Sequence, residues 1–237
     1  MLISEVFHSV QGEGRLVGVP SVFVRTSGCN LRCSWCDTPY ASWNPEGTEM
    51  SVDAILEAVS AFPSHHVVVT GGEPLIARGM ADLLAALQKS GRHITIETAG
   101  TVAPPAGLVP PCNLASLSPK LSHSTPKPGT IEPSWIARHD ERRLQPTIIL
   151  QWLRAAPEWQ LKFVVAQPQD MAEIETLLDT LRTEHPIPAE NVILMPEGID
   201  SSTLASRSGW IVETCKEKGY RFGPRLHVDL FGHTRGT

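Results

Sequence analysis

Short β-rich segments alternate with helical patterns along most of this chain, and this alternation limits the folds that are open to it. Runs rich in β-branched and aromatic residues predict strands, at residues 1–7, 21–26, 67–69, 93–97, 113–118, 161–165, 191–195 and 226–230. Apolar residues at helical spacing predict helices between them, at 52–62 after an N-cap at Ser51, 80–89 before Gly91, 134–155, 171–184 and 202–218. Pro146 is expected to break or bend the helical segment 134–155.

Alternation of this kind predicts parallel strands joined by right-handed crossovers. About six such units are visible, which is fewer than the eight of a closed barrel. We therefore expect a partial, about six-stranded β/α TIM-like barrel, with an open doubly wound sheet as the alternative. The 237 residues suffice for a single domain that spans residues 1–237.

Charge and hydropathy argue against two classes of function. The formal net charge of −5 is the wrong sign for a nucleic-acid-binding surface. No apolar run is long enough to cross a membrane, and the first residues lack the pattern of a secretory signal. We therefore expect a cytoplasmic protein whose thiols are kept reduced.

Unusual polar segments follow the predicted strands. A cysteine-rich loop follows residues 21–26, and Gly71-Gly72-Glu73-Pro74 follows 67–69, while Glu97, Ser118 and Met195 stand at the ends of later strands. Ligands of β/α folds bind where the carboxyl ends of the strands meet the following loops. The sequence therefore predicts that all these segments meet at one mouth.

Three of the five cysteines lie close together, in a C-x3-C-x2-C spacing formed by Cys29, Cys33 and Cys36. In a reducing compartment this pattern indicates metal binding rather than disulfides. Three thiolates leave one iron of a [4Fe–4S] cluster open, whereas electron-transfer clusters use four cysteines. A zinc site would need a fourth ligand, and no second cysteine pair is present. Cys112 and Cys215 stand alone and are expected to be buried, inert thiols.

The triplet, with the aromatic residue Trp35 before its last cysteine, resembles the hallmark of the radical S-adenosylmethionine (SAM) superfamily. The Gly71–Pro74 segment resembles the second hallmark, in which paired glycines let the backbone approach the methionine end of SAM. The resemblance implies that the open iron of the cluster binds SAM and that electron transfer releases a 5′-deoxyadenosyl radical. This radical, rather than a side chain, would do the chemistry.

Four further segments, residues 8–14, 23–25, 36–38 and 97–98, together resemble the 7-carboxy-7-deazaguanine synthase family. That family converts 6-carboxy-5,6,7,8-tetrahydropterin to 7-carboxy-7-deazaguanine with loss of ammonia, on the route to queuosine. The resemblance implies hydrogen abstraction from C6 followed by ring contraction. It also implies a Mg²⁺ ion bound through Thr38, a reducing partner such as flavodoxin, and a homodimer.

The residue types suit such a substrate. Gln11 and Glu13 offer the polar edges that the amide and amino groups of a pterin require. Arg25 ends an otherwise apolar strand, where a cation is costly without an anion, so we expect it to bind the substrate carboxylate. A structural ion pair of Arg25 with Glu13 or Glu97 is the alternative.

The resemblance assigns two sets of contacts. The substrate-binding residues would be Val10, Gln11, Gly12, Glu13, Arg25, Thr70, Glu97 and His227. The SAM-binding residues would be Trp35, Gly71, Gly72, Glu73, Ser118, Pro119, Lys120, Met195, Pro196, Glu197 and Gly198.

Two features depart from the family, and two rival functions remain. Ala99 stands where many members carry asparagine, and residues 121–155 look like an insertion relative to shorter members. A rival within the superfamily is an activase that installs a glycyl radical on a partner protein. A more remote rival is a non-enzymatic electron-transfer module, which would leave the Gly71–Pro74 turn unexplained.

Overall fold

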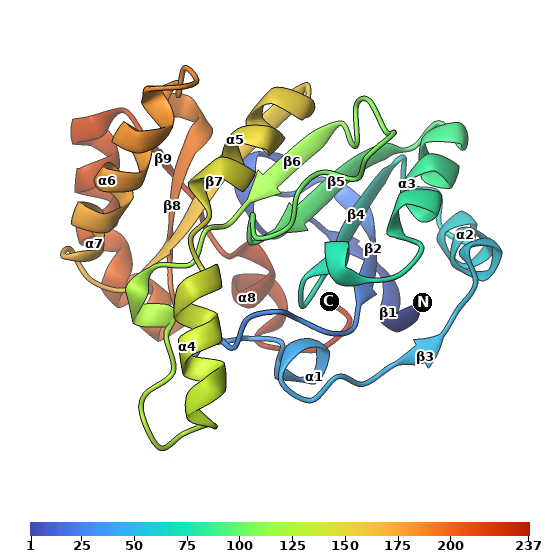
Figure 1. Cartoon of the computed structure of the whole chain (residues 1–237), viewed down its shortest axis with the longest axis horizontal. Helices are drawn as coiled ribbons and strands as arrows, with labels where there is room; N and C mark the ends of the chain where they lie inside the picture. Colours follow the sequence, from blue (N-terminus) through green and yellow to red (C-terminus); the bar gives the residue numbers. More distant parts are fainter.

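The computed structural model describes residues 1–237 and contains a single nine-stranded sheet (Figure 1). The strands are β1 (Leu2–Val10), β2 (Pro20–Thr26), β3 (Thr48–Glu49), β4 (His66–Gly71), β5 (His93–Thr98), β6 (Leu114–Leu117), β7 (Glu158–Val165), β8 (Val192–Pro196) and β9 (Arg221–Phe222). Their order in the sheet is β3-β1-β2-β4-β5-β6-β7-β8-β9. From β2 onward, each strand therefore lies beside the next parallel strand in sequence.

The topology is that of an incomplete barrel. Strands β2 and β4 to β9 pair in parallel, whereas β1 runs antiparallel to β2, and β3 antiparallel to β1. A doubly wound sheet would reverse its strand order at a switch point, and no reversal occurs among the parallel strands. The partial β/α barrel is thus confirmed, with an unclosed sheet whose edges are β3 and β9.

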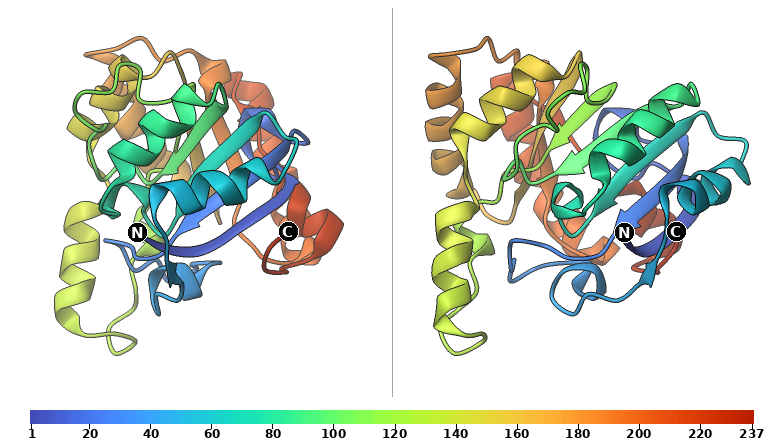
Figure 2. Two further views of the ribbon diagram at one scale, coloured as in Figure 1. Left: turned by 90° about the vertical axis from the view of Figure 1, so that its right-hand side faces the viewer. Right: turned by 45° about the vertical axis from the view of Figure 1, so that its right-hand side comes forward.

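The helices are α1 (Pro39–Ser42), α2 (Val52–Ser60), α3 (Met80–Lys89), α4 (Pro133–Arg142), α5 (Pro146–Ala155), α6 (Asp170–Arg182), α7 (Ser201–Lys218) and α8 (Leu226–Phe231). Helices α2, α3, α5, α6 and α7 cover one face of the sheet and bury their apolar residues in the core, whereas α1, α4 and α8 add no residue to this core (Figure 2). The Ser51 side chain accepts from the Ala54 N–H and begins α2, as predicted. Pro146 is the first residue of α5, where its missing N–H costs nothing, so the predicted break separates two helices.

Core residues and cavity residues lie on opposite faces of the sheet, because successive side chains of a strand point to opposite sides. In β2, Val22 and Val24 belong to the apolar core under the helices, so Arg25 points to the other face. In β5, Ile94 and Ile96 are core residues and Glu97 faces the opposite side. The inner face of the barrel can therefore be polar while the outer face holds the chain together.

Residues 226–230 do not form the predicted last strand. They lie in helix α8, and the last strand is the two-residue β9. A run of five residues cannot distinguish a strand from one helical turn by apolar spacing, and Val228 alone of this helix is buried. No helix in the chain has both the length and the apolar character needed to cross a bilayer.

Candidate active site

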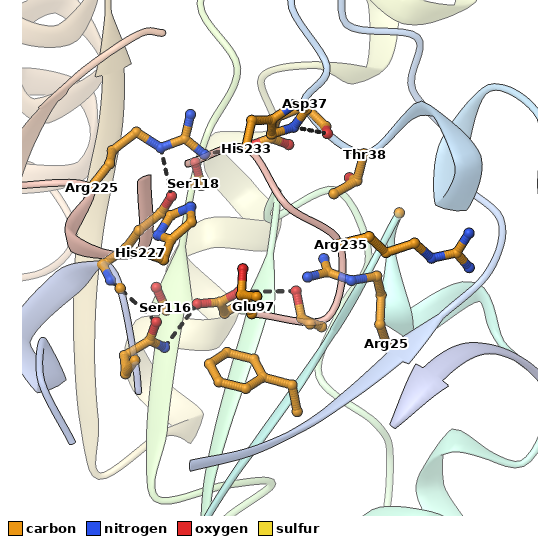
Figure 3. A pocket seen from close by; sticks show the side chains of 18 of the residues that line it. Arg25, Asp37, Thr38, Glu97, Ser116, Ser118, Arg225, His227, His233 and Arg235 are labelled. Carbon is orange, nitrogen blue, oxygen red and sulfur yellow. Dashed lines mark hydrogen bonds and ion pairs between the residues drawn. The ribbon is translucent and has the colours of Figure 1, made fainter. Parts of the chain in front are cut away.

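A cavity of about 290 Å³ opens at the carboxyl ends of the parallel strands, where the sequence predicts the mouth (Figure 3). All eight predicted substrate residues line it, together with the predicted magnesium ligand and five of the predicted SAM residues. These are Val10, Gln11, Gly12, Glu13, Arg25, Thr70, Glu97 and His227, then Thr38, then Trp35, Gly71, Gly72, Ser118 and Lys120. Segments far apart in the sequence thus share one wall.

Glu97 is fixed from two neighbouring elements. The Gln11 side-chain amide donates to one carboxylate oxygen at 3.1 Å. The Thr70 hydroxyl, on β4, donates to the other at 2.9 Å. The carboxylate is therefore held in one orientation on the cavity wall, where it can accept hydrogen bonds from a ligand (Figure 3).

Arg25 faces the cavity but is also ion-paired. Its Nε donates to Glu5 Oε1 at 2.7 Å, and the Tyr40 hydroxyl donates to the same oxygen at 2.9 Å. The structural partner is therefore Glu5, rather than Glu13 or Glu97. No protein acceptor lies within hydrogen-bond distance of the two terminal nitrogens of Arg25, which leaves them available to an anion in the cavity.

Glu13 lies in a charged network that the sequence did not reveal. Its carboxylate pairs with Lys162 of β7 and, at 3.0 Å, with Arg225 Nε. Arg225 also donates to Asp37 and to the carbonyl oxygen of Gly198. Burial alone would raise the pKa of Glu13, but the two cations outweigh it and lower the pKa below its usual range.

Lys162 could have been found by the reasoning that singled out Arg25. It interrupts the apolar run Leu161–Val165, and its side chain is almost fully buried. A lysine inside such a strand requires an anion on the inner face. Arg225, in contrast, follows Gly223-Pro224 and has no comparable signal.

His227 packs directly on the glycine turn that carries the substrate residues. A Cβ atom built on Gly12 would lie 2.0 Å from His227 Nδ1. Glycine at this position therefore allows the ring to close one side of the cavity. Burial lowers the pKa of His227, although Glu13 opposes this effect.

The three cysteines of the triplet share a small apolar cluster with Leu31 and Ala99. Burial raises the pKa of Cys29 to about 11 and of Cys33 to about 12, so a bound metal would have to displace their protons. No group of three or more His, Cys, Asp or Glu side chains is arranged to hold a single metal ion. In a cubane each thiolate binds a different iron, so a cluster does not require three sulfurs that converge on a single metal ion.

The Gly71–Pro74 turn is pressed against the cysteine loop. A Cβ atom on Gly72 would lie 2.3 Å from the Gly28 carbonyl oxygen and 2.7 Å from Cys29 Cβ. The Glu73 side chain is fully buried, and its carboxylate accepts from the Thr98 hydroxyl and the Ala99 N–H. Glu73 thus joins two turns of the mouth and does not line the cavity.

Two observations beside the cysteine loop fit a ligand such as SAM. Trp35 lines the cavity, and its buried indole Nε1 has no hydrogen-bond partner. Lys120 Nζ lies 5.4 Å from the centre of the Trp35 ring and donates to Ser118 Oγ at 2.9 Å. A cation on the cavity wall suits a carboxylate-bearing molecule.

Five other predicted SAM residues do not line the cavity. Pro119 lies between two that do, and Met195 and Pro196 are buried in β8. Glu197 pairs with Arg207 of α7, and the Gly198 carbonyl accepts from Arg225. Cys112 and Cys215 are buried as predicted, and burial raises the pKa values of both thiols, to about 12 and about 11.

The family of the chain follows from comparison with known proteins. Residues 23–106 match the Radical SAM superfamily. The 7-carboxy-7-deazaguanine synthase of Rhodopirellula baltica is 46% identical over 100% of this chain and 89% of its own length. That of Halobacterium salinarum is 48% identical over 99% of this chain and 92% of its own length. The chain belongs to the 7-carboxy-7-deazaguanine synthase family. It is a radical SAM enzyme of the lyase type.

Solved structures agree on the fold. QueE from Escherichia coli matches with a TM-score of 0.69 at 26% identity, over 95% of this chain and 94% of that chain. SuiB from Streptococcus suis bound to S-adenosylmethionine matches with a TM-score of 0.54 at 12% identity, over 83% of this chain and 48% of that chain. The second likeness concerns the fold alone. The family membership supports an iron–sulfur cluster and SAM as the cofactors of this synthase.

Proposed function

We propose that this synthase converts 6-carboxy-5,6,7,8-tetrahydropterin to 7-carboxy-7-deazaguanine and releases ammonia. The observation that carries the proposal is one cavity whose wall is shared by two sets of groups. Gly71, Gly72 and Trp35 lie beside or in the cysteine loop, and Arg25 and Glu97 lie on the strands that flank β4. A hydrogen atom on a bound pterin would thus lie close to bound SAM.

The polar groups of the cavity match the edges of a pterin. The ionised Glu13 and the fixed Glu97 can both accept hydrogen bonds, and the pterin offers N–H donors on its ring and its amino group. The free end of the Arg25 guanidinium can bind the substrate carboxylate. His227 would then close the ring face above Gly12.

The cluster and SAM would be held by neighbouring residues of the chain. Cys29, Cys33 and Cys36 would ligate three irons, and Lys120 and Trp35 would contact SAM. When bound, the cluster and SAM would supply hydrogen-abstraction chemistry through a 5′-deoxyadenosyl radical. The overall conversion balances without an added oxidant, because the product differs from the substrate by one ammonia. The walls of the cavity would exclude water from the radical.

A small cavity favours this function over a glycyl-radical activase. A volume of about 290 Å³ is close to the lower limit for small-molecule sites and suits small ligands rather than a protein segment. A macromolecular substrate would need an open groove beside the cysteine loop, where α4 lies instead (Figure 1).

We further propose that Mg²⁺ binds at Thr38. The Thr38 hydroxyl lines the cavity and makes no helix-capping bond at the start of α1. The neighbouring Asp37 is engaged by Arg225, so the remaining ligands would be substrate oxygens and water. Magnesium commonly keeps several waters and takes few protein ligands, which is consistent with this poor donor set.

The partners of the enzyme are also proposals. Its electron donor would be an acidic flavodoxin that approaches the cysteine loop near Arg32 and Arg138, which flank Trp135. A homodimer would cover Leu230 and Phe231, apolar side chains exposed on α8. Thiolate ligation of a reduced cluster fits the cytoplasm, where thiols stay reduced.

The test is anaerobic incubation of the reduced, reconstituted enzyme with SAM and the carboxytetrahydropterin. Mass spectrometry should detect a product that differs from the substrate by the loss of one ammonia. Arg25→Gln should weaken substrate binding but leave slow SAM cleavage without substrate intact. Arg15→Gln is the matched control, because Arg15 pairs with Glu158 outside the cavity. Absence of the product with intact SAM cleavage would refute the proposed substrate.

A further inference from the structure

The connection between β6 and β7 contains more chain than a crossover requires. Helix α5 lies against β6, β7 and α6 and serves as the crossover helix. Residues 121–145, which include α4, extend away from the barrel and pass beside the cysteine loop (Figure 1, Figure 2). No residue of this segment lines the catalytic cavity, although Lys120, which directly precedes it, does.

His139 of α4 joins this segment to the backbone of the cysteine loop. Its side chain is 0% exposed, and its Nδ1 lies 3.0 Å from the Arg32 backbone nitrogen. Its Nε2 lies 3.0 Å from Ser124 Oγ, whose own hydroxyl donates to the Leu121 carbonyl at 2.6 Å. The tautomer follows from these partners, because Nε2 must carry the hydrogen and Nδ1 must accept from the Arg32 N–H.

The same segment holds the loop on the other side of Cys33. The Ser34 N–H donates to the Ser124 carbonyl at 2.8 Å. The amides that flank Cys33 are therefore both bonded to residues of the connection, on Ser124 and His139. Neither amide is free to rotate toward a cluster bound by the adjacent thiol.

The Arg32 side chain completes the contact. Its guanidinium carbon lies 3.9 Å from the centre of the Trp135 ring, and Nη1 donates to the Cys29 and Leu31 carbonyls at 2.9 and 2.7 Å. Stacking on α4 thus fixes a cation that ties together the residues between Cys29 and Cys33. Backbone and side chain of Arg32 both depend on this one helix.

We propose that His139 is a positioning residue for the iron–sulfur cluster, acting through the Arg32 amide, and that residues 121–142 form a brace for the cysteine loop. The proposal rests on cluster binding at the three cysteines. Hydrogen bonds to cluster sulfurs tune the reduction potential, and outer contacts orient the ligands. By engaging the Arg32 amide, His139 keeps this donor from the cluster and holds Cys33 in place.

Two variants and one rescue test the brace in the full-length, reconstituted protein. His139→Leu removes both ring bonds with little change in volume, and Ser124→Ala removes the Nε2 partner together with its bond to the Leu121 carbonyl. His139→Asn places an amide oxygen near the position of Nδ1 and should restore the bond to Arg32. Ile174→Ala in α6 is the control for general destabilisation, because Ile174 is buried in the main core and does not belong to the apolar cluster around the cysteines.

The readouts are the rate of iron loss to a chelator and the electron paramagnetic resonance spectrum of the reduced cluster. We expect His139→Leu to lose iron about tenfold faster, the factor for one hydrogen bond of ordinary strength, and to show shifted g values. The rate of iron loss and the g values of His139→Asn should lie close to those of the parent protein. Loss rates and g values of His139→Leu that match those of Ile174→Ala would overturn the proposal.

A Cys33→Ala variant separates this proposal from the proposed function. If Cys33→Ala binds no cubane while His139→Leu behaves like the parent, the brace is refuted and the cluster assignment stands. If Cys33→Ala retains a full cubane, the ligand assignment fails and the brace fails with it. If Cys33→Ala abolishes the cubane and His139→Leu makes it lose iron faster, both the ligand assignment and the brace are supported.

Discussion

Replacing Arg225 by methionine should destabilise the enzyme more than any change to a surface ion pair. Arg225 is bonded to Glu13, to Asp37 and to the Gly198 carbonyl, and 8% of its side chain is exposed. Methionine fills the volume but leaves Asp37 without a cation, whereas Glu13 keeps Lys162. Breaking one partner of a buried pair costs about 3–5 kcal/mol, and the side chain of Asp37 is 35% exposed, so the cost should lie near the lower limit.

About 3 kcal/mol corresponds to a fall of roughly 6–12 °C in Tm for a chain of this size. Urea unfolding of the cluster-free protein with and without the substitution measures the change directly. Arg225→Met combined with Asp37→Asn should recover part of the loss, because no carboxylate is then left unpaired. Arg15→Met is the control, since Glu158 is 62% exposed and such pairs contribute under about 1 kcal/mol. If Arg225→Met costs no more than Arg15→Met, the network is not a stabilising element.

Three further changes test other parts of the site. Gly12→Ala should displace His227 and raise KM at least tenfold with little effect on substrate-free SAM cleavage, which steady-state kinetics can separate. Gly72→Ala should push the turn away from Cys29 and reduce the iron content after reconstitution, as measured by iron analysis. Acid should destabilise the fold through His139, because burial lowers its pKa from 6.5 to about 4 and the unfolded chain binds the proton more tightly. The free energy of unfolding should therefore fall as the pH drops from 6.5 toward 4, by up to about 3 kcal/mol, and His139→Leu should flatten this slope in urea titrations at several pH values.

The fold and the cavity wall were predictable because successive side chains of each strand point to opposite faces of the sheet. Val22 and Val24 alternate with Arg25, and Ile94 and Ile96 with Glu97, so core and site residues separate along each strand. The ends of the parallel strands then meet on one side. That geometry alone brings the segments after β2, β4 and β5 to one cavity.

The rest depends on contacts that no local pattern carries. Glu13 meets Lys162 and Arg225 through tertiary structure, and the sequence holds no signal for their pairing. The short segment 226–230 has too few residues for its period to decide between helix and strand. Residues 195–198 end a strand of the barrel, but Glu197 is drawn to Arg207 of the following helix. A position at a strand end therefore favours a role in the site but does not establish one.

The ion pair between Glu13 and Arg225 joins residues that are 212 positions apart. During synthesis, the ribosome must therefore release the chain as far as Arg225 before this corner of the cavity can close. A nascent chain that has emerged as far as β8 can already hold the cysteine loop and most of the sheet. It would still lack Arg225, the second cation on Glu13, and His227, so cluster insertion could precede the ability to hold substrate.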